Sequence, residues 1–184
     1  MNKPFIHLSA LVLLAGTLNA DNYWSRFRGP NGRGVISGGN PPVKLDVDTH
    51  LSWKVPIQLG HSSPVTWGDR LFLTSFKDNT VFTHSFSRID GMIEWSRGRS
   101  YNGPRRGPGF ADLHEDTNPA AATPCVDADR VYAYCPSIGL TSYDHQGNEI
   151  WHHAFPNTPF LYGTGGSPMV HRGIVFLLRD SLKK

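Results

Sequence analysis

The chain has 184 residues, of which 39% are hydrophobic and 18% are charged. These proportions are those of an ordinary globular domain, and they exclude a disordered tail and a membrane protein with many spans. The formal net charge of +3 is too small to indicate a particular partner. The content of 19 Gly, 14 Pro, 10 Phe, 6 Tyr and 5 Trp favours short strands joined by tight turns, which predicts an all-β fold.

Residues 1–20 are predicted to be a signal peptide. Lys3 supplies a positive charge, residues 8–18 are mostly apolar, and Ala20 is a small residue at the expected cleavage site. The apolar run of roughly eleven residues is well short of the ~20 that cross a bilayer, so we expect cleavage and no membrane span. The mature chain then begins at Asp21 and is periplasmic or extracellular. Residues 21–50 are expected to form an N-terminal extension.

A repeated pattern of strand, polar turn and strand occupies residues 63–72, 123–132 and 167–176, which align without gaps. A Pro opens the first strand of each copy, where its missing N–H costs no hydrogen bond of the sheet. A second hairpin follows the first two copies, and in both a Trp stands four residues after a Gly. Four short antiparallel strands per unit, repeating at roughly 40 to 50 residues, predict the blades of a β-propeller.

The repeats place a partial propeller of about two and a half four-stranded blades at residues 51–184. Residues 51–53, with the sequence Leu-Ser-Trp, resemble the outermost strand of a preceding blade. The first two copies are further apart than the last two, because residues 98–122 contain an insertion rich in Gly, Pro and Arg. We expect this insertion to be a surface loop.

The two cysteines are expected to remain free thiols. If residues 127–130 form a hairpin turn, Cys125 faces Tyr132 and Val126 faces Val131. Cys135 then lies about three positions out of register and on the opposite face of the sheet, where it cannot pair with Cys125. Two buried thiols are the better prediction.

Further motifs accompany the repeats: Tyr23-Trp24, Phe-Arg-Gly-Pro-Asn-Gly at 27–32, His-Ser-Ser-Pro at 61–64 and Tyr-Gly-Thr-Gly-Gly-Ser-Pro at 162–168. With these motifs the chain resembles the pyrroloquinoline-quinone-like (PQQ-like) β-propeller repeat proteins, and its opening motif is similar to that of exported members from planctomycete-type bacteria. The resemblance implies seven or eight blades in a chain about twice this length or more, so we expect a fragment. It also points to the outer-membrane assembly factor B type, whose lipid-attachment Cys is missing here.

The alternative function is that of a fragment of a PQQ-dependent oxidoreductase. The resemblance implies that such enzymes combine a calcium site with a catalytic Asp, a stacking Trp and two adjacent cysteines. Calcium needs roughly six to eight oxygen ligands, of which this chain supplies few, and Cys125 and Cys135 lie ten positions apart. No cofactor is therefore expected, and PQQ with calcium enters only under the alternative. The histidines lack the spacing of metal ligands, so no metal site is predicted.

The sequence favours an exported, non-catalytic propeller that serves as a binding or scaffolding module in the cell envelope. Its partner is an unknown envelope protein or a glycan, nucleic acid is not expected, and the open blade edges allow self-association. Any ligand is expected at the mouth of the central channel, in the loops that enter the innermost strands. The candidate ligand-binding residues in these loops are His61, Ser62, Asn118, Thr164 and Gly165.

A basic cluster also stands around the insertion, where arginines alternate with aromatic residues. An anionic glycan or a phospholipid head group has chemistry that suits it, but we expect a solvated loop. The residues concerned are Arg97, Arg99, Tyr101, Arg105, Arg106 and Phe110.

Overall fold

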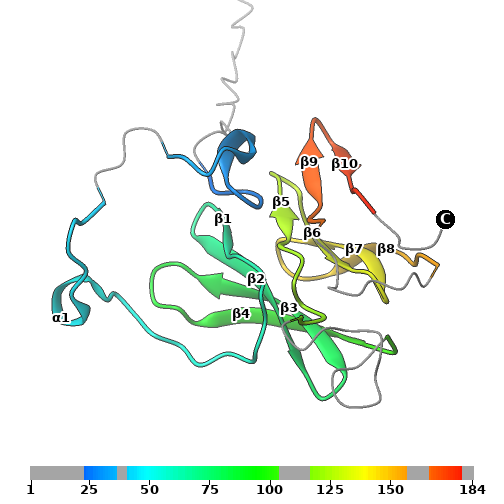
Figure 1. The fold of residues 1–184 in the computed structure, drawn as a ribbon, viewed down its shortest axis with the longest axis horizontal. Coiled ribbons are helices and arrows are strands. Elements are labelled where there is room, and N and C mark those ends of the chain that lie inside the picture. Colours follow the sequence, from blue (N-terminus) through cyan, green and yellow to red (C-terminus); the bar gives the residue numbers. More distant parts are fainter. Residues whose placement is uncertain (1–22, 37–40, 104–116, 157–165, 180–184) are drawn as a thin grey trace, which may run out of the picture.

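The computed structural model describes residues 23–36, 41–103, 117–156 and 166–179. In this part of the chain two antiparallel sheets of four strands are followed by one hairpin, each in sequential order (Figure 1). The first sheet contains β1 (Val65–Trp67), β2 (Arg70–Lys77), β3 (Thr80–Ser87) and β4 (Ile93–Ser100). The second contains β5 (Cys125–Val126), β6 (Arg130–Cys135), β7 (Gly139–Asp144) and β8 (Glu149–His153). The hairpin contains β9 (Met169–His171) and β10 (Ile174–Phe176).

The fold is a partial β-propeller with two complete blades and the first hairpin of a third, so the predicted class is confirmed. Its only helices within the described ranges are the single turn α1 (Val47–His50) and a 3-10 turn at Pro30–Gly32. No helix in those ranges is long and apolar enough to cross a membrane. The predicted signal peptide lies outside the described residues. Part of the expected insertion, 104–116, also lies outside them, whereas Gly98 to Ser100 continue β4.

The register of β5 and β6 matches the expectation for the cysteines. Cys125 pairs with Tyr132 and Val126 with Val131, and both thiols are free and buried. Burial raises the pKa of Cys135 to about 11 and that of Cys125 further still, so neither is a reactive thiolate at neutral pH.

Two apolar interfaces hold the blades together, one on each side of the second sheet. Because neighbouring residues of a strand point to opposite faces, Val131 of β6 packs on the first blade and Tyr132 packs on the third hairpin. The first interface joins Val65, Trp67, Phe72 and Trp95 to Val126, Val131, Ala133 and Tyr143. The second joins Cys125, Tyr132, Tyr134 and Leu140 to Val170, Val175 and Leu177.

Hydrogen bonds between equivalent residues fix the order of the three repeats. The N–H of Ser63 donates to the hydroxyl of Thr123 at 2.9 Å, and the N–H of Thr123 donates to the hydroxyl of Ser167 at 3.1 Å. These residues are the first of each aligned segment. A Ser or Thr at this position therefore receives a backbone N–H from the preceding repeat.

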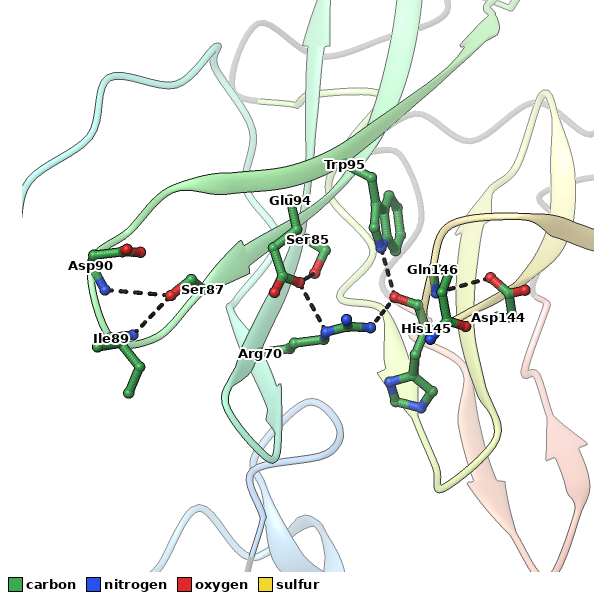
Figure 2. Close-up of polar contacts among 10 residues, drawn as sticks. All are labelled: Arg70, Ser85, Ser87, Ile89, Asp90, Glu94, Trp95, Asp144, His145 and Gln146. Atoms are coloured by element: carbon green, nitrogen blue, oxygen red, sulfur yellow. Dashed lines mark hydrogen bonds and ion pairs between the residues drawn. The ribbon is translucent and has the colours of Figure 1, made fainter.

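The repeated Trp and Gly have a common role in docking one blade on the next. The indole of Trp95 donates to the carbonyl oxygen of His145 at 2.9 Å (Figure 2). Its ring lies against Gly147. Trp53 donates to the carbonyl oxygen of Arg88 at 2.9 Å and lies against Gly91 in the same way. Residues 51–53 are not a strand, since no neighbouring strand pairs with them, but Trp53 still docks as an outermost-strand Trp does.

The start of the extension joins the innermost strands of the two blades. The N–H of Thr66 donates to the carbonyl oxygen of Trp24 at 2.8 Å, and that of Val126 donates to the carbonyl oxygen of Ser25 at 2.9 Å. Gly29, at φ +64°, allows the Trp24 ring to lie where a Cβ atom would collide with it. The motif at 27–32 thus forms a turn that holds this segment in place.

Candidate functional site

Three of the candidate ligand-binding residues come together where the chain enters the first two blades. The N–H groups of His61 and Ser62 both donate to the carbonyl oxygen of Ala120, at 3.0 and 3.1 Å. The side-chain oxygen of the buried Asn118 accepts the N–H of Ala120 at 2.8 Å. The other two candidates, Thr164 and Gly165, lie outside the described residues.

These loop residues bind the backbone of the propeller itself. The hydroxyl of Ser62 accepts the N–H of Thr74 at 2.9 Å and donates to its carbonyl oxygen at 3.2 Å. The side chain of Asn118 also accepts a backbone N–H, that of Ala120, whereas the side chain of His61 is exposed. A ligand at this mouth would therefore meet His61 first, and its binding there stays a prediction.

An open groove with a volume of about 750 Å³ lies between β4 of the first blade and the second blade. Its walls are mainly polar, and both are built from strands and tight turns of the complete blades. Such a surface is held more rigidly than a site made of loops. The lining residues are Arg97, Gly98, Arg99, Ser100, Ser137, Ile138, Tyr143, Gly147, Asn148, Glu149 and His152.

The arginines of β4 reach across to the second blade. Arg97 Nε donates to the carbonyl oxygen of Gly147 at 2.6 Å, and Arg99 Nη2 forms an ion pair with Glu149. Burial raises the pKa of the nearby Tyr143 hydroxyl, and the charge of Arg99 opposes this rise. The side chains of Arg99 and Glu149 are 28% and 44% exposed, so water screens their pair to about 1 kcal/mol or less. Arg99 Nε is buried and has no hydrogen-bond partner.

His152 faces the groove from β8 and is neutral at physiological pH. Burial, followed by the charge of Arg99, lowers its pKa, and its Nδ1 lies 3.0 Å from the hydroxyl of Thr141. Two guanidinium groups therefore face one carboxylate, that of Glu149, in the groove. The excess of positive charge in the groove therefore favours an anion as its ligand.

The sequence interpretation grouped Arg97 and Arg99 in a basic cluster, but it expected a solvated loop because it assigned residues from 98 onward to an insertion. It therefore did not predict this groove. In the structure Trp95, Arg97 and Arg99 share one face of β4, as every second residue of a strand does. The buried Trp95 shows that this face points to the second blade. An alternating Trp-x-Arg-x-Arg pattern was therefore the available signal, whereas Glu149 and His152 carried none.

A second set of polar contacts links the blades next to the docked Trp95. Arg70 pairs with Glu94 at 2.9 Å and also donates to the carbonyl oxygen of His145 (Figure 2). Ser85 donates to the same carboxylate at 2.8 Å. Every one of these groups has a partner within the protein, so the arrangement supports the blade contact.

One Ser–His contact has the geometry of a nucleophile and its base. Ser75 Oγ lies 2.7 Å from His84 Nε2 and 3.2 Å from Gln58 Oε1. Ser75 is completely buried, and burial lowers the pKa of His84 to about 4. A substrate has no access to this hydroxyl, so the pair packs the interior of the first blade. No group of three His, Cys, Asp or Glu side chains in the described ranges is placed to hold a metal ion.

Comparison with known proteins gives a likeness in fold. No protein-family model matches the sequence, and no curated protein matches it. Among solved structures, BamB from Moraxella catarrhalis superposes with a TM-score of 0.49 at 16% identity, over 68% of this chain and 36% of BamB. The chain thus spans about a third of the length of that protein. A likeness at this level says nothing of function.

Proposed function

We propose that this chain is an exported, non-catalytic β-propeller module that binds or scaffolds a component of the cell envelope. The observation that carries the proposal is the polar groove of about 750 Å³ between the two complete blades. Pockets of this size accommodate small ligands or a segment of a larger one. Both walls are strands and tight turns of the complete blades, which are held together by the docked Trp95 and by the apolar interface beneath it.

Other parts of the proposal rest on the sequence. Residues 1–20 support export to the periplasm or the extracellular space. The motifs at 27–32 and 162–168 support membership of the exported PQQ-like repeat class and a longer complete protein. An envelope protein or a glycan is the proposed partner. Neither PQQ nor calcium belongs to this proposal.

Titration with PQQ separates the proposed function from the oxidoreductase alternative. The whole mature chain would be titrated with PQQ in the presence of calcium, while the fluorescence of its tryptophans is followed. We expect no saturable change, and no reduction of an artificial electron acceptor when alcohols or sugars are added. Saturable one-to-one binding at micromolar PQQ would overturn the proposal in favour of the enzyme.

Intact mass of the exported product tests its localisation. The product from the periplasm or the medium is expected to begin at Asp21, because signal peptidase cleaves after a small residue such as Ala20. An exported product that retains residues 1–20 contradicts the cleavage. A product confined to the cytoplasm removes export from the proposal.

A further inference from the structure

The two arginines of β4 form one side of the groove between the blades. Arg97 is held by the carbonyl oxygen of Gly147 and lies over the Trp95 ring, with 5.9 Å from its central carbon to the ring centre. Arg99 is held by its ion pair with Glu149. Both side chains are thus oriented before any ligand arrives, which lowers the entropy cost of binding.

The charges of the groove are not balanced. Arg97 and Arg99 face the single carboxylate of Glu149, and the imidazole of His152 is neutral because of its lowered pKa. An oxyanion entering the groove would supply the missing negative charge.

The remaining lining distinguishes between carriers of such an oxyanion. The walls include the hydroxyls of Ser100 and Ser137 and the amide of Asn148, whose nitrogen also donates to Asp144 at 2.8 Å. Ile138 is the one aliphatic side chain among the lining residues. The outer edge of β4 has no neighbouring strand in the described sheet. Sugar hydroxyls match these groups, and an acyl chain does not.

We propose that this groove binds an acidic oligosaccharide, with the carboxylate or sulfate of one sugar held by Arg97 and Arg99. The inference rests on the proposed function and names the chemical class of the ligand. The neighbouring sugar hydroxyls contact Ser100, Ser137 and Asn148. Glu149 accepts a hydroxyl donor of the sugar while it remains close to Arg99.

Calorimetric titration of the whole mature chain tests the proposal with four probes. The probes are a trigalacturonate, a sulfated chondroitin tetrasaccharide, the neutral sugar maltotriose and free inorganic sulfate. We expect binding of at least one acidic oligosaccharide, with affinity that falls as salt screens the charges. Maltotriose is expected not to bind. Free sulfate that binds as tightly as the sulfated oligosaccharide would overturn the saccharide assignment.

A pair of Arg variants supplies the matched control. Arg97→Gln removes a guanidinium that donates to the carbonyl oxygen of Gly147 at 2.6 Å, and Arg88→Gln removes one that donates to the carbonyl oxygen of Gly68 at 2.6 Å, outside the groove. Arg97→Gln should weaken binding about tenfold, the loss of one charge-assisted hydrogen bond. Arg88→Gln should leave it unchanged. Equal effects of the two substitutions would contradict the site.

Arg97→Lys keeps the positive charge. It is needed because Arg97→Gln could weaken binding by disturbing the packing of the two blades instead of by removing the charge. It should recover part of the affinity, and circular dichroism would report the fold of each variant. A folded, exported chain that binds neither acidic oligosaccharide at millimolar concentration overturns this inference and leaves the proposed function intact. Saturable binding of PQQ overturns the proposed function, and the inference that rests on it, whatever the oligosaccharide titration shows.

Discussion

β6 and β10 occupy the same place in successive repeats, but their surroundings differ. β6 is buried on both faces, since the first blade covers Val131 and the third hairpin covers Tyr132. In β10 the second blade covers Val175, whereas Phe176 is 46% exposed. Val131 and Tyr132 of β6 align with Val175 and Phe176 of β10, so the two strands are similar in sequence at these positions. Their burial is therefore set by the blade that follows, as nearest-neighbour stabilisation in repeat proteins requires.

The largest expected difference concerns the association of whole molecules. The outer face of the third hairpin exposes an apolar patch made of Met169, Ile174, Phe176 and Leu178. Such a patch on an open sheet edge promotes association, so the mature chain is expected to elute above its monomer mass. The double variant Phe176→Ser with Leu178→Ser should shift it toward the monomer.

Size-exclusion chromatography with light scattering measures this mass directly. Val175→Ser with Leu177→Ser is the control, because these side chains face the second blade and their loss should destabilise the hairpin without removing the exposed patch. A sharp monomer peak for the unaltered chain, with a cooperative thermal transition, would show that the exposed face does not drive association.

The next largest effect is expected in the free energy of unfolding, when the same repeat position is changed on a covered face and on an open one. Phe72 and Phe176 align in the repeats, but Phe72 is fully buried and packs near Trp95, with 6.0 Å between ring centres. Phe72→Ala should lower the free energy of unfolding by about 3–5 kcal/mol because it leaves a cavity. Phe176→Ala should change it by about 0.5 kcal/mol or less. Urea unfolding followed by Trp fluorescence measures both changes. Equal losses of unfolding free energy would contradict the view that the neighbouring blade decides how much this position contributes.

The buried His84 of the first blade should make stability depend on pH. Its pKa is about 4 in the folded chain and 6.5 in the unfolded chain, so the unfolded state binds more protons between these values. The stability is therefore complete above pH 6.5 and is lost as the pH falls toward 4. A shift of this size corresponds to at most about 3 kcal/mol. Denaturant midpoints at pH 7, 5.5 and 4.5 should fall less steeply in His84→Gln than in the unaltered chain, and parallel profiles would contradict this role.

The smallest expected effect compares two glycines of the blade turns. Gly147 and Gly68 have φ of +81° and +56°, so Ala at either site incurs the left-handed backbone cost of about 1 kcal/mol. A Cβ at Gly147 would lie 2.7 Å from the Trp95 ring, whereas nothing lies within 4 Å at Gly68. Gly147→Ala should therefore cost about 1–3 kcal/mol more than Gly68→Ala. Thermal unfolding measures the difference, and equal costs would show that the Trp95 dock tolerates displacement.

The repeat pattern predicted most of the described fold, because strand, turn and strand are specified by residues close together in the chain. The turn at 127–130 set the pairing of Cys125 with Tyr132, which the structure confirms. The site was predicted less well. His61, Ser62 and Asn118 do lie together, but their hydrogen bonds serve the backbone, which their sequence did not reveal.

By itself, the sequence determined the hairpins, the alternation of faces and the chain order of the blades. These features follow from turn chemistry and a two-residue period, which act over a few residues. Only the tertiary structure decided that Arg99 meets Glu149 across the groove and that Trp95 docks on Gly147. Each of these contacts joins groups of different blades about 50 residues apart in the chain, with no local pattern to connect them. Whether a strand face is covered is likewise decided by the neighbouring blade, because burial requires an apolar partner that the strand itself does not contain.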